Sequence, residues 1–304
     1  MSSKGKWVAP AALLTGAWVW GLIWYPYRAL EALGVSAALA TCRTYGLALV
    51  LGLAAFPGAL RQIRAHPWML LAIALAAGWT NFAYVLGTLR GEVMRVLLLF
   101  YLAPFWTLLF ARILLNERAS PQGYLVLALS LAGAAVMLWH PETGAPAPRA
   151  LAEWLGLSAG MMFALSNVLI RKAQTLSIEI KALSVSGGVT LITLIFESYG
   201  GGFAALSSVS AETGLLLALV GGVIFAVNLA VQHGLTFTPA NQAIVIFMSE
   251  LVVAAAAAYF LAGESLSPRE WVGGAMIAAA ALFSGRMRPP EPNPQPRVEA
   301  PGSN

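Results

Sequence analysis

Aspartate is absent from this sequence of 304 residues, and the 13 acidic residues are all glutamate. Cysteine occurs once, as Cys42 within an apolar run. These shortages exclude aspartyl proteases, paired-aspartate metal sites, intrachain disulfides and cysteine metal clusters. The 3 histidines, His66, His140 and His233, are all expected at helix ends or in loops, so no metal and no cofactor is predicted.

Charged side chains are also scarce, at 10 % of the residues, whereas soluble domains carry about a quarter. Hydrophobic residues make up 59 % of the chain, and its mean hydropathy is +0.75. The apolar residues form runs too long and too frequent for one globular core, so we predict an all-α integral membrane protein. The net charge of +5 is spread in ones and twos between these runs, which is typical of topology signals rather than of a nucleic-acid surface.

A membrane-spanning helix needs about 20 mainly apolar residues, because each adds about 1.5 Å and the hydrocarbon core is about 30 Å thick. Ten segments are predicted to cross the membrane. They are Trp7–Tyr27, Ser36–Phe56, Trp68–Thr88, Val93–Leu114, Gln122–Trp139, Trp154–Ile170, Ala182–Ser198, Leu215–Gln232, Asn241–Leu261 and Glu270–Gly285. Glycine and proline residues that favour turns lie between them.

The loops between these segments are too short to form a soluble domain. Lys4 and Lys6 precede the first segment as they would in a signal peptide, but the segment is rich in tryptophan and lacks a small-residue cleavage site. We therefore expect it to be retained. The tail at 286–304 is polar and rich in proline, so we expect it to be disordered and cytoplasmic.

Lysine and arginine are distributed unequally between alternate loops. One set of loops holds Lys4, Lys6, Arg61, Arg64, Arg112, Arg118, Arg171, Lys172, Lys181, Arg286, Arg288 and Arg297. The other set holds Arg28, Arg90, Arg95, Arg149 and Arg269. Because cytoplasmic loops are enriched in these residues, we predict a bacterial inner membrane protein with both termini in the cytoplasm.

Two pairs of segments are similar to each other. The run from Tyr101 to Pro121 resembles the run from Met248 to Pro268, at an offset of 147 residues (268 − 121). Gly16 to Ala29 resembles Gly160 to Ala173, at an offset of 144 residues (160 − 16). These matches predict two repeats of five helices, at 1–139 and 154–285, joined by a periplasmic linker at 140–153. Because five is odd, the repeats are inverted, and carriers of this design bind substrates near the midplane between their repeats.

Several motifs make the chain similar to a known family. They are Glu92-Val93 before Tyr101-Leu102-x-Pro104, the loop Asn116-Glu117-Arg118, the glycines Gly123 and Gly133, and Trp20. With these motifs the chain resembles the drug/metabolite transporter superfamily built from EamA-type repeats, and within it the aromatic amino acid exporters of the YddG type. The resemblance implies export of amino acids through a central cavity. Ala103 and Phe163 stand where some YddG-type exporters have tryptophan, which points to a range broader than aromatic substrates.

Polar and aromatic residues near the expected middle of the membrane are the candidates for substrate binding. They are Trp20, Asn81, Tyr84, Tyr101, Phe163, Asn167, Asn228 and Glu250. Such a set offers hydrogen-bonding groups and aromatic walls for an amino acid. Packing of Trp20 and hydrogen bonds that tie helices together through the asparagines are the alternative interpretation.

Glu250 and Pro104 are the two most specific features. A carboxylate in mid-membrane is costly unless it is paired, protonated or in contact with water. Glu250 is therefore a candidate site for a substrate ammonium group or a proton, with Arg43 or Arg95 as partners if its role is structural. Pro104 lies in mid-helix, where it removes a backbone hydrogen bond, so it is a candidate hinge or static kink.

Other functions are less well supported by the sequence. No HExxH, GxSxG or aspartate pair indicates an enzyme, and no filter-like run indicates a channel. A multidrug or other small-metabolite exporter of the same superfamily is the alternative to an amino acid exporter. We expect the chain to work as a monomer, with a proton as the candidate coupling ion.

Overall fold

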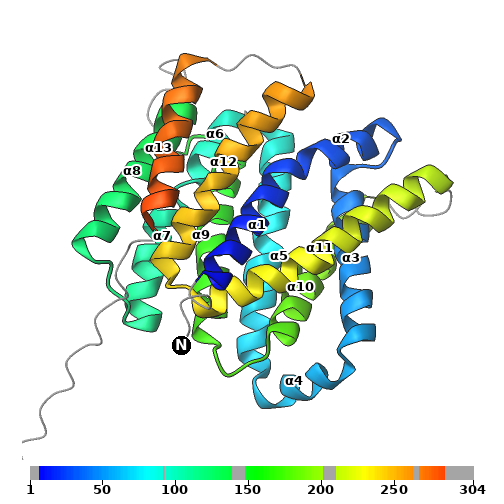
Figure 1. The fold of residues 1–304 in the computed structure, drawn as a ribbon. Coiled ribbons are helices and arrows are strands. Elements are labelled where there is room, and N and C mark those ends of the chain that lie inside the picture. Colours follow the sequence, from blue (N-terminus) through cyan, green and yellow to red (C-terminus); the bar gives the residue numbers. More distant parts are fainter. Residues whose placement is uncertain (1–6, 92, 139–147, 201–209, 263–266, 285–304) are drawn as a thin grey trace, which may run out of the picture.

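The computed structural model describes residues 7–91, 93–138, 148–200, 210–262 and 267–284, and the regular elements in these ranges are all helical (Figure 1). In chain order they are α1 (Val8–Leu22), α2 (Trp24–Ala32), α3 (Ala37–Ala55), the 3₁₀-helix η2 (Pro57–Leu60), α4 (Arg61–Ala65), α5 (Pro67–Arg90), α6 (Val93–Phe100), α7 (Ala103–Phe110), the π-helix η3 (Ala111–Leu115), α8 (Pro121–Leu138), α9 (Leu151–Lys172), α10 (Ile178–Gly200), α11 (Ala211–Phe237), α12 (Ala240–Ala262) and α13 (Pro268–Ser284). The all-α prediction is confirmed. The predicted tail and most of the predicted linker lie outside the described residues.

Within the described ranges, 9 helical stretches are long and apolar enough to cross a bilayer. One of them combines α1 with α2, and another runs from α6 through α7 to η3. The tenth predicted segment corresponds to α13, which has 17 residues. At about 1.5 Å per residue it spans about 25 Å, less than the hydrocarbon core of about 30 Å. The count of ten membrane crossings therefore stays a prediction.

Several helices extend beyond the predicted boundaries. α9 begins at Leu151 rather than Trp154, α10 begins at Ile178 rather than Ala182, and α11 continues to Phe237 rather than ending at Gln232. Hydropathy detects only the apolar part of a helix, whereas backbone hydrogen bonding continues through polar residues that find partners at the ends. The segment after α3, predicted as a loop, contains η2 and α4.

Two of the predicted helices are interrupted four residues before a proline. α1 ends at Leu22, four residues before Pro26, and α6 ends at Phe100, four residues before Pro104. A proline lacks the N–H that would bond to the carbonyl four residues earlier, and its ring clashes with that carbonyl. Pro104 lies in the first turn of α7 and the break falls at Tyr101 and Leu102, so the role of Pro104 as a hinge or kink stays a prediction.

Hydrogen bonds between loops define one end of the helix bundle. Gln62 Oε1 accepts a hydrogen bond from the Ser177 N–H at 2.9 Å, and Glu117 Oε2 accepts one from the Ala240 N–H at 3.1 Å. Gln242 Nε2 donates to the Ser284 carbonyl at 3.0 Å. These bonds bring alternate connections together at one end, which is the lower end of Figure 1, where α4 lies. This end carries Arg61, Arg64, Arg112, Arg118, Arg171, Lys172 and Lys181.

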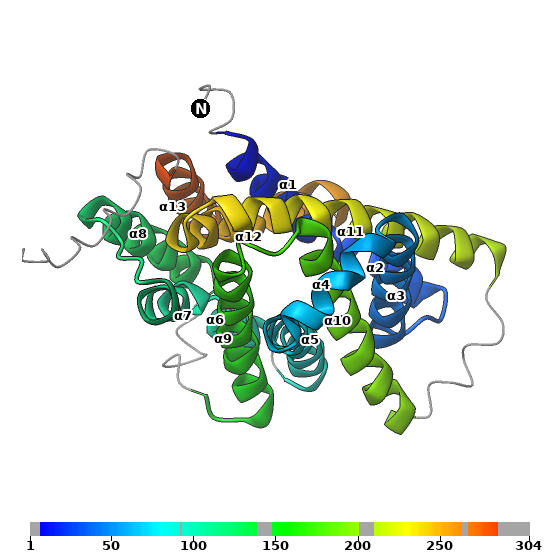
Figure 2. The same cartoon turned by 90° about the horizontal axis from the view of Figure 1, so that it is seen from below.

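The helix contacts have a symmetric pattern. α5 packs against α9 and α10, while α11 packs against α1 and α3. α12 packs against α1, while α6 and α7 pack against α9. α3 also packs on α10, and α8 on α13. These pairs map onto one another when each of the ten predicted segments is exchanged with the segment five places away in the chain. The smaller α9–α11 and α8–α12 contacts have no counterpart of similar extent. Seen from below in Figure 2, α11 and α12 follow one side of the bundle, and α5, α9 and α10 lie on the other.

The α8–α13 contact, visible in Figure 1, depends on two facing glycines. A Cβ added to Gly273 would lie 2.5 Å from the Gly133 carbonyl oxygen, and one added to Gly133 would lie 2.8 Å from the Gly273 carbonyl oxygen. Small residues allow membrane helices to approach closely, so that van der Waals packing replaces the hydrophobic driving force. A Cβ added to the neighbouring Gly274 meets no atom within 4 Å.

We predict opposite effects for Gly273→Ala and Gly274→Ala. The first forces a methyl group into the Gly133 carbonyl and should lower the free energy of unfolding by about 1–3 kcal/mol. The second adds helix propensity without a clash, so it should be neutral or stabilising by up to about 1 kcal/mol. Thermal unfolding of the purified chain in detergent, followed by circular dichroism, measures both. Equal midpoints for the two variants would contradict this packing.

Candidate functional site

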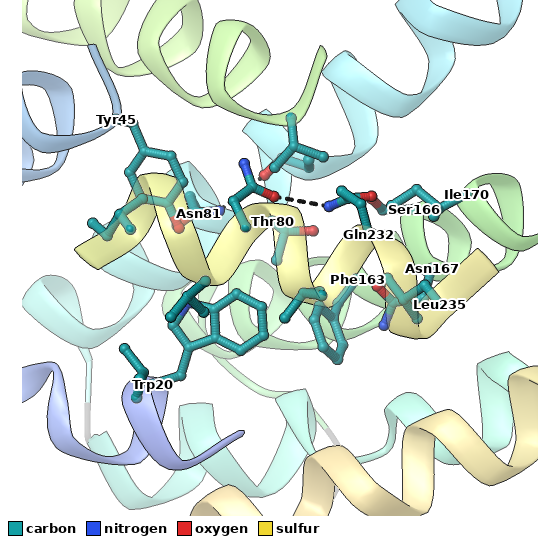
Figure 3. Close-up of a pocket in the computed structure, with 17 residues that line it drawn as sticks. Trp20, Tyr45, Thr80, Asn81, Phe163, Ser166, Asn167, Ile170, Gln232 and Leu235 are labelled. Atoms are coloured by element: carbon teal, nitrogen blue, oxygen red, sulfur yellow. Dashed lines mark hydrogen bonds between the residues drawn. The ribbon is translucent and has the colours of Figure 1, made fainter. Parts of the chain in front are cut away.

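A cavity lies between helices of the first and second halves of the chain (Figure 3). It contains about 590 Å³ of space, including its open mouth. α1, α3 and α5 supply one part of the wall, and α9, α10 and α11 supply the other. The lining residues are Val19, Trp20, Tyr45, Ala77, Thr80, Asn81, Phe163, Ser166, Asn167, Ile170, Val185, Ile224, Val227, Asn228, Val231, Gln232 and Leu235.

The lining is uncharged. Its polar groups are three hydroxyls, three asparagine amides and one glutamine amide, and its aromatic rings are those of Trp20, Tyr45 and Phe163. In Figure 3 the Trp20 and Phe163 rings lie along one side of the cavity, and Gln232 and Asn167 lie toward the end marked by Ile170 and Leu235. Such a surface can orient a ligand by hydrogen bonds and stacking, but it offers no opposite charge to an ion.

A chain of amides crosses the α10–α11 side of this cavity. Asn228 Nδ2 donates to the Ala182 carbonyl at 3.1 Å and to Ser186 Oγ at 2.9 Å. Gln232 Nε2 donates to Asn228 Oδ1 at 2.8 Å, shown by the dashed line in Figure 3. Because a backbone carbonyl only accepts, it fixes the Asn228 NH₂ toward Ala182. The Asn228 oxygen then requires the NH₂ of Gln232, and this leaves Gln232 Oε1 as a free acceptor.

Two buried polar atoms of the lining have no hydrogen-bond partner in the described part of the chain. They are Gln232 Oε1 and Asn167 Nδ2. Gln232 is only 2 % exposed and Asn167 only 8 %. An unpaired buried donor or acceptor costs about 1–3 kcal/mol, so such groups usually meet water or a ligand. The cavity thus presents one acceptor and one donor that no described residue satisfies.

A chain of aromatic rings leads away from the cavity. The ring centroids of Trp20 and Phe247 are 5.7 Å apart, those of Phe247 and Phe163 are 5.6 Å apart, and those of Phe163 and Phe100 are 5.6 Å apart. Tyr84 and Tyr101 contact Phe100 at centroid distances of 5.2 and 5.3 Å. These spacings are typical of favourable edge-to-face and tilted pairs. The rings therefore form a continuous apolar wall between the cavity and the α5–α6 region.

Five of the eight predicted binding residues line the cavity, namely Trp20, Asn81, Phe163, Asn167 and Asn228. Tyr84 and Tyr101 instead lie at the far end of the aromatic chain, in contact with Phe100. Glu250 is on α12, three residues after Phe247, and its backbone packs against Gly21. It does not line the cavity. The substrate-binding role of all eight residues stays a prediction.

Four polar lining residues were not predicted from the sequence. They are Tyr45, Thr80, Ser166 and Gln232. Tyr45 lies near the middle of its predicted segment, so the same depth rule would have found it. Gln232 was the last residue of a predicted segment and would have been at the membrane surface. α11 continues for five further residues, and this extension moves Gln232 inward.

Arg95, considered as a partner for Glu250, is paired with a different glutamate. Arg95 Nε lies 2.7 Å from Glu153 Oε1, and Arg95 Nη2 donates a hydrogen bond to Glu153 Oε2 at 3.0 Å. The Arg149 backbone N–H also donates to Glu153 Oε2 at 2.8 Å. This arrangement follows from the earlier start of α9, which places Glu153 within a helix beside α6. Glu250 has no ion pair or hydrogen bond from the described residues.

A second ion pair joins four segments at the end of the bundle that holds α4. Glu117 Oε1 lies 3.1 Å from Arg171 Nε, and Glu117 Oε2 accepts from the Ala240 N–H at the start of α12. Arg171 also donates to the Thr236 carbonyl. Lys181 is fully buried, and its Nζ donates to Thr236 Oγ1 at 2.7 Å. The network ties the ends of η3, α9 and α11 to the start of α12, just beyond the cavity.

The geometry is that of a multi-pass membrane protein with a cavity between its two halves, and comparisons with known proteins show what it is similar to. Residues 150–286 match the EamA-like transporter family, so this part of the chain is similar to the predicted family. Among described residues, no group of three or more metal-binding side chains is present.

Two curated relatives are similar over most of the chain. A protein described as an uncharacterized transporter from Archaeoglobus fulgidus is 27 % identical over 235 residues, which cover 77 % of this chain and 82 % of that protein. A riboflavin transporter from Rhizobium johnstonii is 27 % identical over 233 residues, which cover 74 % of this chain and 72 % of that transporter. A solved crystal structure aligns with a TM-score of 0.71 at 18 % identity, covering 91 % of this chain and 96 % of that one, which is a likeness of fold.

We predict that Glu117→Gln destabilises the protein. It removes the charge that holds Arg171 while both side chains are only 13 % and 18 % exposed, so the free energy of unfolding should fall by about 1–3 kcal/mol. The control is Glu212→Gln, an exposed residue in the first turn of α11, which should cost less than about 1 kcal/mol. Thermal unfolding in detergent measures both variants. If they unfold alike, the network does not stabilise this end.

Proposed function

We propose that this protein is a carrier that moves a small metabolite across the membrane by alternating access, with the substrate in the cavity between its two halves. The observation that carries the proposal is the composition of that cavity wall. α1, α3 and α5 contribute Trp20, Tyr45 and Asn81, and α9, α10 and α11 contribute Phe163, Val185 and Gln232. A site shared in this way opens to one side or the other when the halves rock against each other.

Two inverted repeats of five helices are part of this proposal. The main helix pairs, which map onto one another under exchange of the two halves, support them, because a duplicated unit related by a two-fold axis must pair in that way. The match to the family model at 150–286 supports the predicted second repeat at 154–285. Pro104 and the break at Tyr101–Leu102 remain candidate hinge elements within the first repeat.

We further propose that the end carrying α4 faces the cytoplasm of a bacterial inner membrane, with both termini inside and export as the direction of transport. The concentration of arginine and lysine at this end supports the orientation, because cytoplasmic loops are enriched in them. Export by a monomer is an expectation from the sequence and from the resemblance to YddG-type exporters.

Amino acids, aromatic and others, are the substrates that this resemblance favours. The aromatic rings of Trp20, Tyr45 and Phe163 support an aromatic side chain in the cavity. The similarity to a riboflavin transporter supports a second candidate, a larger ring system with polar edges. Cationic drugs are less well matched, because the lining contains no carboxylate. Glu250 remains a candidate proton site outside the cavity.

The function is tested by counterflow in proteoliposomes that contain the purified chain. A panel of labelled amino acids, riboflavin, a cationic dye and a nucleotide sugar should include at least one exchanged substrate. Trp20→Ala should reduce its exchange by about tenfold or more, because it removes an aromatic wall from the site. The matched control is Trp18→Ala on the same helix, because Trp18 is 55 % exposed on the outer surface. No exchange of any compound would refute the carrier.

The orientation is tested by labelling single cysteines in intact cells. After Cys42→Ala removes the natural thiol, Arg64→Cys and Arg269→Cys place new thiols at exposed positions on opposite ends of the bundle. A membrane-impermeant maleimide should label Arg269→Cys and leave Arg64→Cys unlabelled until the cells are opened. The reverse pattern would show that the end carrying α4 faces outward.

A further inference from the structure

The two unpartnered atoms of the cavity specify what a ligand must present. Gln232 Oε1 requires a donor, and Asn167 Nδ2 requires an acceptor. The free atom of Gln232 is fixed as an acceptor by the hydrogen-bond chain that starts at the Ala182 carbonyl. A ligand that satisfies both atoms carries a hydrogen-bond donor, such as an N–H, and an acceptor, such as a C=O.

The remaining walls add two conditions. The rings of Trp20 and Phe163 both pack against Phe247 and form one side of the cavity, which favours a flat ligand that stacks or packs edge to face. The lining carries no charged side chain, and burying an ion without a counter-charge is costly. The nearby cation Lys181 already donates to Thr236 Oγ1 and does not line the cavity.

We propose that the cavity binds an uncharged, flat heteroaromatic molecule whose edge carries an N–H beside a C=O, as in a cyclic amide or imide. This inference rests on the proposed carrier function and names the substrate class of the same site. The edge meets Gln232 Oε1 and Asn167 Nδ2, and the ring face lies along the aromatic side. A zwitterion presents two full charges to neutral amides, so this cavity disfavours it relative to the neutral ring.

Equilibrium dialysis against the purified full chain in detergent tests this chemistry. The probe is lumichrome, a neutral tricyclic ring with an imide edge, which is measured by its own fluorescence. Its N1,N3-dimethyl derivative keeps the ring but lacks both N–H groups. Lumichrome should bind, and methylation should weaken binding by about tenfold or more, because Gln232 Oε1 is then left unpaired. Tryptophan and flavin mononucleotide should bind more weakly than lumichrome.

A variant assigns the effect to Gln232. In Gln232→Leu the difference between lumichrome and its dimethyl derivative should disappear, whereas Gln122→Leu, the same change at an exposed position of α8, should keep it. If Gln232→Leu fails to fold, the comparison of the two probes on the unmodified chain still decides. Equal binding of the two probes to that chain, or no lumichrome binding, overturns the inference.

Counterflow with the same preparation separates this inference from the carrier function. Exchange of tryptophan without any binding of lumichrome overturns the substrate class and leaves the carrier standing. Tighter binding of tryptophan than of lumichrome has the same meaning. Absence of exchange for every compound of the panel overturns the carrier itself.

Discussion

A polypeptide inside a bilayer finds no water for its backbone N–H and C=O groups, so these groups must be satisfied within the protein. This constraint accounts for the helices that make up the described ranges. It also decides where the helices break. Pro104 frees the Phe100 carbonyl, and the glycine at position 160 of α9 packs directly against that carbonyl. A break at membrane depth is tolerated here because neighbouring helices cover it.

The cavity is one region where this constraint is relaxed. Asn228 in its wall is fully bonded to neighbours, through Ala182 and Ser186. At the cavity, Gln232 and Asn167 each leave one atom without a described partner. These two unpaired atoms therefore lie at the space that can hold a ligand. A site that recognises a ligand through uncharged hydrogen-bonding groups needs those groups in fixed orientations. The hydrogen bonds between α10 and α11 fix the orientation of Asn228 and Gln232.

The charged side chains of the two ion pairs join helices at the two ends of the bundle. Arg95 and Glu153 join α6 to α9 at one end, and Glu117 and Arg171 join η3 to α9 and α12 at the other. α9 takes part in both pairs and also lines the cavity. A movement that opens either end must therefore change contacts of the helix that carries Phe163 and Asn167. The fold thus links the cavity to both ends through α9.

The sequence alone predicted that the protein lies in a lipid bilayer, that its fold is all-helical, and roughly where its helices lie. Hydropathy and helix length can be judged from composition over about 20 residues. It also located Trp20, Phe163, Asn167 and Asn228 near mid-membrane depth, since depth is a count along one helix. Depth does not say which way a side chain points. Only the packing of the helices separated Gln232, which lines the cavity, from Glu250 and Tyr101, which do not. Likewise, the pairing of Arg95 with Glu153 depends on contacts between residues far apart in the chain, which no local pattern encodes.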